Sequence, residues 1–126
     1  MRQILKILVA ALGLVLAAPA SAHHSFAAFD RSREMEISGT VKEFQWTNPH
    51  TWLIVTVLKE GGTTVDYAFQ GYNPAELPRM GITRNKFKPG DKVTVKFFPR
   101  KDDANGGQMV GVRFTAEQPP ATATSN

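Results

Sequence analysis

The sequence predicts an all-β domain that forms a small barrel. Five segments rich in β-branched and aromatic residues alternate between apolar and polar positions, as strands with one buried face do. The first of these segments changes the parity of its apolar positions, which indicates the bend that a small closed barrel needs. After the third segment, residues 71–90 break the alternation and leave room for one short helix.

The first 22 residues have the features of a secretory signal peptide. Arg2 and Lys6 supply the positive start, residues 7–18 the apolar core, and Ala20-Ser21-Ala22 a small-residue cleavage site. A membrane anchor is the weaker alternative, because this core is shorter than the roughly 20 residues that a span needs. We expect a periplasmic mature chain that begins at His23 and contains no membrane span.

The mature chain is expected to fold as one domain, residues 23–116, without disulfides. Removing 22 of the 126 residues leaves 104, enough for a modest core, and the chain has no cysteine. The mature chain carries 13 basic and 11 acidic residues, and this surplus is small for a nucleic-acid binder, so we expect no nucleic-acid partner. Eight of the basic residues and one acid lie between Arg79 and Lys101, which predicts a basic face.

An arm, residues 23–34, precedes the first strand, and Phe26 and Phe29 are expected to hold it down. The first strand, residues 35–46, places its apolar side chains at odd positions up to Val41 and at even positions from Phe44. This shift predicts a β-bulge at Lys42-Glu43.

Residues 47–50, Thr-Asn-Pro-His, form a tight connection that Pro49 prevents from being helical. The second strand, Trp52 to Leu58, is apolar at nearly every position, so we expect both of its faces to be covered. Glu60-Gly61-Gly62 predicts a hairpin that leads into a third, alternating strand from Val65 to Phe69.

The short helix is expected to begin at Asn73 as N-cap, with Pro74 in the first helical position. Pro78 and Gly81 limit it to one or two turns.

Two further strands complete the domain. The fourth carries Val93, Val95 and Phe97 and stops at Pro99, and the fifth carries Val110, Val112 and Phe114. A polar, flexible loop, residues 101–107, joins them, and residues 117–126 form a disordered tail by composition.

This order of elements is that of the OB-fold, a five-stranded Greek-key barrel, with an open sandwich as the runner-up. In OB-folds the loops after strands one and four frame the ligand face. Those loops correspond here to residues 47–50 and 100–107, so His50 is expected on the ligand side.

Several motifs match a known pattern. They are His23-His24-Ser25-Phe26-Ala27-Ala28-Phe29-Asp30, Gly39-Thr40-Val41, Trp46-Thr47-Asn48-Pro49-His50, Ala68-Phe69, and Lys88-Pro89-Gly90-Asp91 with Val93. Together they resemble the domain of unknown function 6152 family of small exported bacterial proteins, over nearly the whole mature chain. The resemblance implies a periplasmic barrel-like domain and no established activity. The family pattern often has an acidic residue where this chain has Gln70, so a carboxylate role there does not carry over.

The three histidines, His23, His24 and His50, are candidate ligands for a transition metal, copper above all. Cleavage after Ala22 would give His23 a free amine and an imidazole that chelate one ion, a donor set that suits Cu(II). His24 would add its ring, and His50 would join if the arm folds back along the first strand. The alternative is that His23 and His24 are solvated and that His50 is satisfied by local backbone.

No catalytic pattern is present, and we expect a protein that is not an enzyme. The aspartates form no recognisable pair, no Gly-x-Ser-x-Gly motif occurs, and Gly106-Gly107 makes no phosphate cradle. The alternative to metal binding is an envelope module that binds a ligand, peptide or protein, with an envelope protein or an anionic ligand as partner. Its ligand face would comprise Trp46, Asn48, Trp52 and Tyr72, although each aromatic ring could instead close a barrel end.

Overall fold

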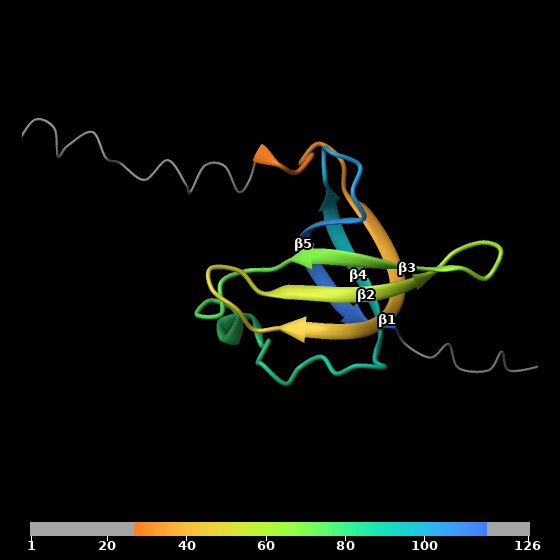
Figure 1. The fold of residues 1–126 in the computed structure, drawn as a ribbon. Helices are drawn as coiled ribbons and strands as arrows, with labels where there is room; N and C mark the ends of the chain where they lie inside the picture. The colour runs from red at the N-terminus through yellow and green to blue at the C-terminus, as the bar shows by residue number, and fades with distance from the viewer. Residues whose placement is uncertain (1–26, 116–126) are drawn as a thin grey trace, which may run out of the picture.

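The structure, a computed structural model, describes residues 27–115. The expected signal peptide and tail, as well as His23 and His24, lie outside the described residues. The elements in chain order (Figure 1) are β1 (Met35–Gln45), β2 (Trp52–Leu58), β3 (Thr64–Gln70), the 3₁₀ helix η1 (Leu77–Met80), β4 (Lys92–Pro99) and β5 (Gly106–Phe114). Within residues 27–115, no helix is long and apolar enough to cross a membrane.

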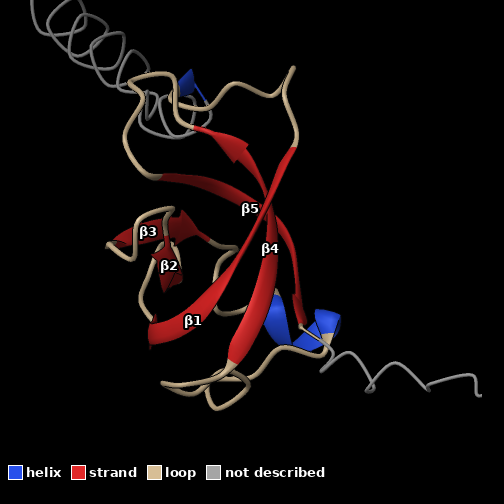
Figure 2. Ribbon diagram, turned by 90° about the vertical axis from the view of Figure 1, so that its right-hand side faces the viewer, coloured by secondary structure: helices blue, strands red, loops and turns tan. Residues whose placement is uncertain are grey.

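The strands close into a barrel in the order β1-β2-β3-β5-β4. The long strand β1 makes this closure possible, because its first half pairs with β4 and its second half with β2. Thr40 belongs to both ladders, opposite Thr56 on one side and Lys92 on the other. Figure 2 shows β1 crossing from the β4 and β5 side of the molecule to the β2 and β3 side. The predicted five-stranded OB-like barrel is confirmed.

A β-bulge bends β1 where the parity shift predicted it. Val41 pairs with Val55 and Glu43 with Ile54, so Lys42 is the extra residue. Gly39, just before the bulge, lies so close to β2 that a Cβ atom would come within 2.6 Å of the Thr56 carbonyl oxygen. The bend therefore needs both the extra residue and the missing side chain.

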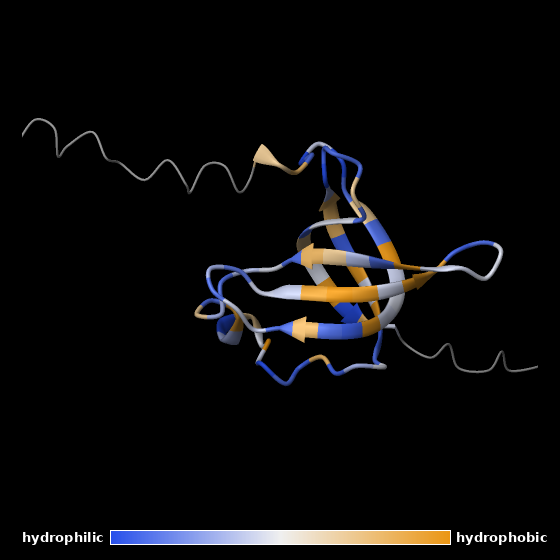
Figure 3. Cartoon of the chain, in the orientation of Figure 1, coloured by the Kyte–Doolittle hydropathy of each residue, from blue (hydrophilic) through white to orange (hydrophobic). Residues whose placement is uncertain are grey.

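The core fills the barrel with side chains from all five strands. Its members on β2 and β4 occupy every second position, with Thr94 and Lys96 between them on β4 and with Ile54 and Thr56 between them on β2 (Figure 3 colours the strands by hydropathy). The buried set comprises Val41, Leu53, Val55, Val57, Phe69, Phe87, Val93, Val95, Phe97 and Met109. Phe69 and Phe97 meet near its centre, with their ring centroids 4.9 Å apart.

The prediction that both faces of β2 are covered is wrong. Leu53, Val55 and Val57 are buried, whereas the intervening side chains are only half-buried. In the described part of the chain no second layer packs on the outer face of β2, because the barrel has a single wall.

The predicted inner face of β5 is also wrong in part. Met109 pairs with Phe97 and Gly111 with Lys96, so Val110 is an extra residue at a second register shift. Met109 is therefore buried, while Phe114 remains 46% exposed. Because the extra residue is itself apolar, the alternation from Val110 to Phe114 does not reveal the bulge at Val110.

The helix is shorter and tighter than predicted. It begins at Leu77, with Pro78 in its first turn and Glu76 as N-cap, and Gly81 ends it in the left-handed conformation. Asn73 forms a turn instead, its side-chain Oδ1 accepting a hydrogen bond from the Ala75 amide at 2.8 Å. A polar side chain followed by proline specifies a turn as readily as a cap.

The described part of the arm is anchored on β4 and does not follow β1. Phe29 is 4% exposed and forms a β-bridge with Arg100. The Asp30 amide donates to the Pro99 carbonyl at 2.8 Å, and the Lys101 amide donates to the Ala28 carbonyl at 3.0 Å. Phe29 thus anchors the arm as predicted, while Phe26 lies outside the described residues.

Candidate functional site

The β1–β2 connection is tied to the segment that follows β3. The Thr47 hydroxyl donates to the His50 carbonyl at 2.6 Å, which closes the turn around the cis Asn48–Pro49 bond. Thr51 is fully buried, and both its amide and its hydroxyl donate to the Tyr72 carbonyl, at 3.1 and 2.9 Å. These bonds fix His50 and Tyr72 in adjacent segments.

A cavity of about 210 Å³ lies between these two segments. Six polar side chains line it together with Pro49 and Gly71: His50, Gln70, Tyr72, Asn73, Glu76 and Gln108. They come from the β1–β2 connection, the end of β3, the segment before η1 and the start of β5. The cavity thus lies at the end of the barrel where β3 pairs with β5.

Two glutamines form the wall of the cavity on the sheet side. Gln70 and Gln108 are opposite each other in the parallel β3–β5 ladder, and Gln70 is 8% exposed. The Gln108 Oε1 atom is buried and accepts no hydrogen bond from any described residue. A buried acceptor of this kind is costly unless a partner reaches it, so the cavity can bind a group that donates a hydrogen bond.

The structure separates the predicted site residues. His50 and Tyr72 line the cavity, and the Tyr72 side chain is 40% exposed. Asn48 is exposed in the connection, and Trp52 is half-buried on the outer face of β2. Trp46 packs edge-on against Phe44, with ring centroids 5.9 Å apart, and does not line the cavity.

Three residues that line the cavity were not predicted from the sequence: Gln70, Gln108 and Glu76. Gln70 ends an alternating strand at a position that faces outward in the pattern, yet it is buried where β3 pairs with β5. A parallel ladder between strands far apart in the chain leaves no local signal in the sequence.

Among residues 27–115, no group of three or more histidine, cysteine, aspartate or glutamate side chains could hold a metal ion. His50 and Glu76 line the same cavity, and His23 and His24 lie outside the described residues.

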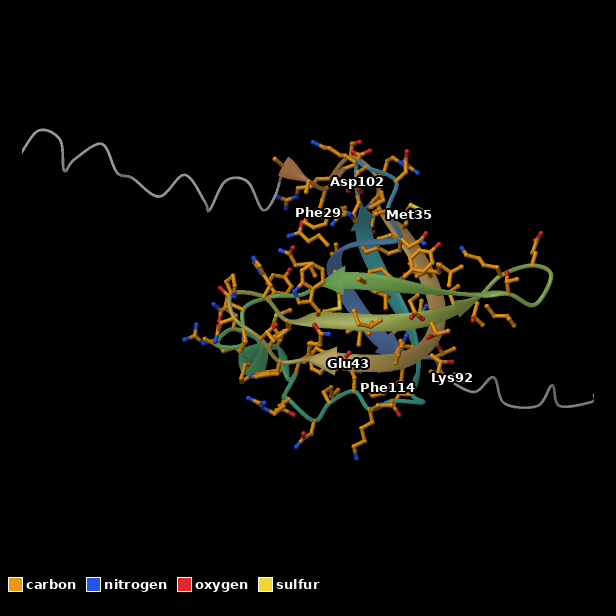
Figure 4. All side chains as sticks on the ribbon, in the orientation of Figure 1. Phe29, Met35, Glu43, Lys92, Asp102 and Phe114 are labelled. Carbon is orange, nitrogen blue, oxygen red and sulfur yellow. The ribbon has the colours of Figure 1, made fainter. Side chains whose placement is uncertain are left out.

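The β4–β5 loop, the second predicted ligand-side loop, is organised by one ion pair. The Arg100 guanidinium donates to both carboxylate oxygens of Asp102, at 2.8 and 2.5 Å, and the Ala104 amide donates to the same carboxylate at 3.2 Å (Figure 4 labels Asp102). The hydrogen bond from Arg100 is the largest cause of a lowered pKa at Asp102, and together with the bond from the Ala104 amide it lowers that pKa to about 2. Beneath the loop lies a second cavity, of about 170 Å³, that includes Tyr67 and Phe97.

Fold and cavity define this protein as a small OB-like barrel with a polar cavity beside the β1–β2 connection. The chain belongs to the family of unknown function DUF6152, whose model matches residues 12–109. The resemblance seen in the motifs is thereby confirmed. No curated protein matches the sequence.

Solved structures with a similar fold include two single-stranded DNA-binding proteins. The mitochondrial protein Rim1 from S. cerevisiae is 16% identical, with a TM-score of 0.48 over 65% of this chain and 93% of that one. The small protein from Streptomyces coelicolor is 14% identical, with a TM-score of 0.44 over 67% of this chain and 92% of that one. At this identity the likeness concerns the fold alone.

These matches correct one expectation. We expected no nucleic-acid partner because the charge surplus is small, yet the proteins similar in fold are named for binding single-stranded DNA, so that exclusion is withdrawn. A net charge is a sum over the whole chain and says nothing about local surfaces.

Proposed function

We propose that this protein is an exported, non-catalytic binding domain that holds a small polar ligand in the cavity beside His50. The observation that carries the proposal is the buried Oε1 atom of Gln108, which lines the cavity and accepts no hydrogen bond from the described residues. A ligand hydroxyl, amide or ammonium group would donate to this atom. The remaining polar side chains would then fix the orientation of the ligand, as the few polar groups of small-molecule sites do.

The volume of the cavity limits the size of this ligand. About 210 Å³ is at or below the lower end of the range for ligand sites, roughly 300–1,000 Å³. The proposal therefore concerns molecules of the size of an amino acid or a monosaccharide, or one side chain of a peptide.

Thermal unfolding with a panel of amino acids, amino-acid amides and hexoses tests the proposal. A ligand at a hundred times its Kd adds about 2.7 kcal/mol, which raises the Tm of a domain of this size by more than about 10 °C. Gln108→Leu should abolish the shift, and Gln108→Glu, which keeps an acceptor, should preserve it for a cationic ligand. Gln45→Leu is the matched control, because Gln45 lies on β1 outside the cavity. A panel that leaves the parent unchanged would contradict the proposal.

A second candidate function is Cu(II) binding by His23, His24 and His50. Its support is the anchor at Phe29, which pairs with Arg100. The adjacent β4 residues Phe98 and Pro99 pair with Gln108 and Gly107, so the anchor is close in the ladder to the cavity that His50 lines. Phe29 follows His23 by six positions, and an extended segment of this length reaches about 20 Å.

Calorimetric titration with Cu(II) separates the two candidates. A chain that begins at His23 should bind one ion far more tightly than a chain with one extra residue before it, because the extra residue moves the free amine. His50→Ala should weaken binding only if the arm reaches the cavity. Acidification should weaken it as well, because protons compete for the imidazole nitrogens. Equal affinity with and without the extra residue would rule out the chelate.

A further inference from the structure

The positive charge of the described residues is concentrated in the segment between β3 and β4. Residues 77–92 carry five basic residues and one acidic residue, whereas the other described residues carry eight basic and nine acidic ones. This segment runs along one end of the barrel, at the lower edge of Figure 1. The described domain therefore has one cationic face and is otherwise nearly neutral.

The cations of this segment make no ion pair with any described residue, whereas at least half of the eight cations elsewhere in residues 27–115 have a carboxylate partner. Four cations elsewhere have carboxylate partners: Lys42 with Asp66, Lys96 with Glu34, Arg100 with Asp102 and Arg113 with Glu36. In contrast, Arg79, Arg84, Lys86 and Lys88 are exposed and make no ion pair with any described residue. We call these four residues the basic face. The carboxylate of Asp91, the acid within the segment, accepts the backbone amide of Lys88 at 2.8 Å.

Aromatic rings hold two cations of the basic face in place. The Arg84 guanidinium lies 6.0 Å from the centroid of the Trp46 ring, and the Lys86 ammonium lies 5.7 Å from that of Phe114. Each cation lies over the face of its ring, so that face is not open to a stacking base. Cation–π contacts of this kind position a charge without neutralising it.

Apolar side chains are exposed among these charges. Met80 is 51% exposed and follows Arg79 directly, and Phe114 is 46% exposed beside Lys86 (Figure 4 labels Phe114). Cations together with exposed apolar side chains are characteristic of surfaces that lie on a membrane interface.

We propose that the basic face docks on an anionic phospholipid surface. Head-group phosphates would neutralise its four cations, and Met80 would enter the boundary between head groups and acyl chains. A single-stranded nucleic acid fits the face less well, because sequence-tolerant binding of this kind uses open aromatic faces for base stacking. None of the four cations lines the cavity beside His50, so this inference stands apart from the proposed ligand site.

Vesicle sedimentation tests the proposal with the protein purified from the exported fraction. The protein should bind vesicles of phosphatidylcholine mixed with phosphatidylglycerol, should not bind phosphatidylcholine alone, and should be released at 1 M salt, where charges are screened beyond about 3 Å. Lys86→Gln with Lys88→Gln should lower the partition constant about thirtyfold. Met80→Ser should weaken binding without any change in charge.

Arg33→Gln with Lys101→Gln is the matched control, because it removes two exposed cations outside the basic face. It should change the partition constant less than about threefold. Equal losses in the two double variants, or binding to neutral vesicles, would overturn the proposal. So would a single-stranded oligonucleotide that binds more tightly than the vesicles and depends on the same lysines, because the face would then be a nucleic-acid site.

Discussion

Asp102 shows how one carboxylate organises a loop of this domain. Arg100 and the Ala104 amide hold it, and its pKa is lowered to about 2 from the ordinary 3.8. Because the folded-state pKa lies below the unfolded one, the contribution of this group to stability is present above about pH 4. It is lost as the pH falls through about 2.

A carboxyl-detected NMR titration should therefore give Asp102 a midpoint near 2 in the parent. Arg100→Gln should raise this midpoint towards the ordinary value of 3.8, because it removes the largest cause of the shift. A midpoint that stays near 2 in the Arg100 variant would show that hydrogen bonds from the backbone, rather than from the guanidinium, lower the pKa of Asp102.

The sequence allowed part of the candidate site to be predicted at the scale of single residues. His50 and Tyr72 line the cavity, and the Pro49 turn places His50 at the edge of the barrel as expected. Gln70 and Gln108 could not be predicted, because amide side chains occur on most solvated surfaces. Only the tertiary pairing of their strands makes these two residues a site.

The register of β1 against β2 predicts how core substitutions in these two strands change the free energy of unfolding. Val41 and Val55 pair across the ladder, with exposed fractions of 2% and 0%. Val41→Asp and Val55→Asp should each lower the free energy of unfolding by several kcal/mol, because each buries an unpaired carboxylate. Thr64→Asp, at the exposed start of β3, should change it by about 0.5 kcal/mol or less. Denaturant unfolding measures all three, and parental stability in both valine variants would refute this register.

Two glycines of β5 test how closely the strands approach each other. A Cβ atom on Gly107 would collide with the Phe98 carbonyl oxygen, whereas one on Gly111 would meet nothing within 4 Å. We expect Gly107→Ala to lower the free energy of unfolding by about 3 kcal/mol or more, since backbone would have to move. Gly111→Ala should be neutral or slightly stabilising, by roughly 0.4–1 kcal/mol. Equal free energies of unfolding for the Gly107 and Gly111 variants would show that the backbone of the β4–β5 ladder can shift to accept the added methyl group at little cost.

The positions of the strands could be predicted better than their registers. Each strand has a period-2 pattern, and the bulge in β1 shifts that pattern visibly at Lys42. In β5 the extra residue is Val110, itself apolar, and so the pattern continues as if no bulge were present. The same limit applies to β2, where apolar residues on the outer face look like core residues in the sequence.

For the whole molecule, the first prediction concerns export. Ala20-Ser21-Ala22 should be the cleavage site, so intact-mass analysis of the exported protein should show a chain that begins at His23. Ala22→Arg should block cleavage and leave the larger mass, because a bulky charged residue replaces the small one. Cleavage several residues later would remove the amine from His23 and end the copper candidate, but it would leave the cavity beside His50 intact.

The topology could be predicted from the order of elements, and the partners could not. Three strands, a helix-sized gap and two strands are compatible with few closed arrangements, and the observed barrel is one of them. The exclusion of nucleic acid rested on the total charge. A total charge does not show that the described domain has one basic face and is otherwise nearly neutral.

The shortness of the β3–β5 ladder has a consequence for motion. These strands pair at only three positions, and the last of them joins Gln70 to Gln108 in the cavity wall. The barrel should therefore open first along this seam, and the seam amides should exchange with deuterium sooner than those of β1, which two ladders hold. Each opening would part the cavity wall and admit a ligand, and a bound ligand would slow exchange along the seam. In this barrel the weakest ladder would thus serve as the entrance to the binding site.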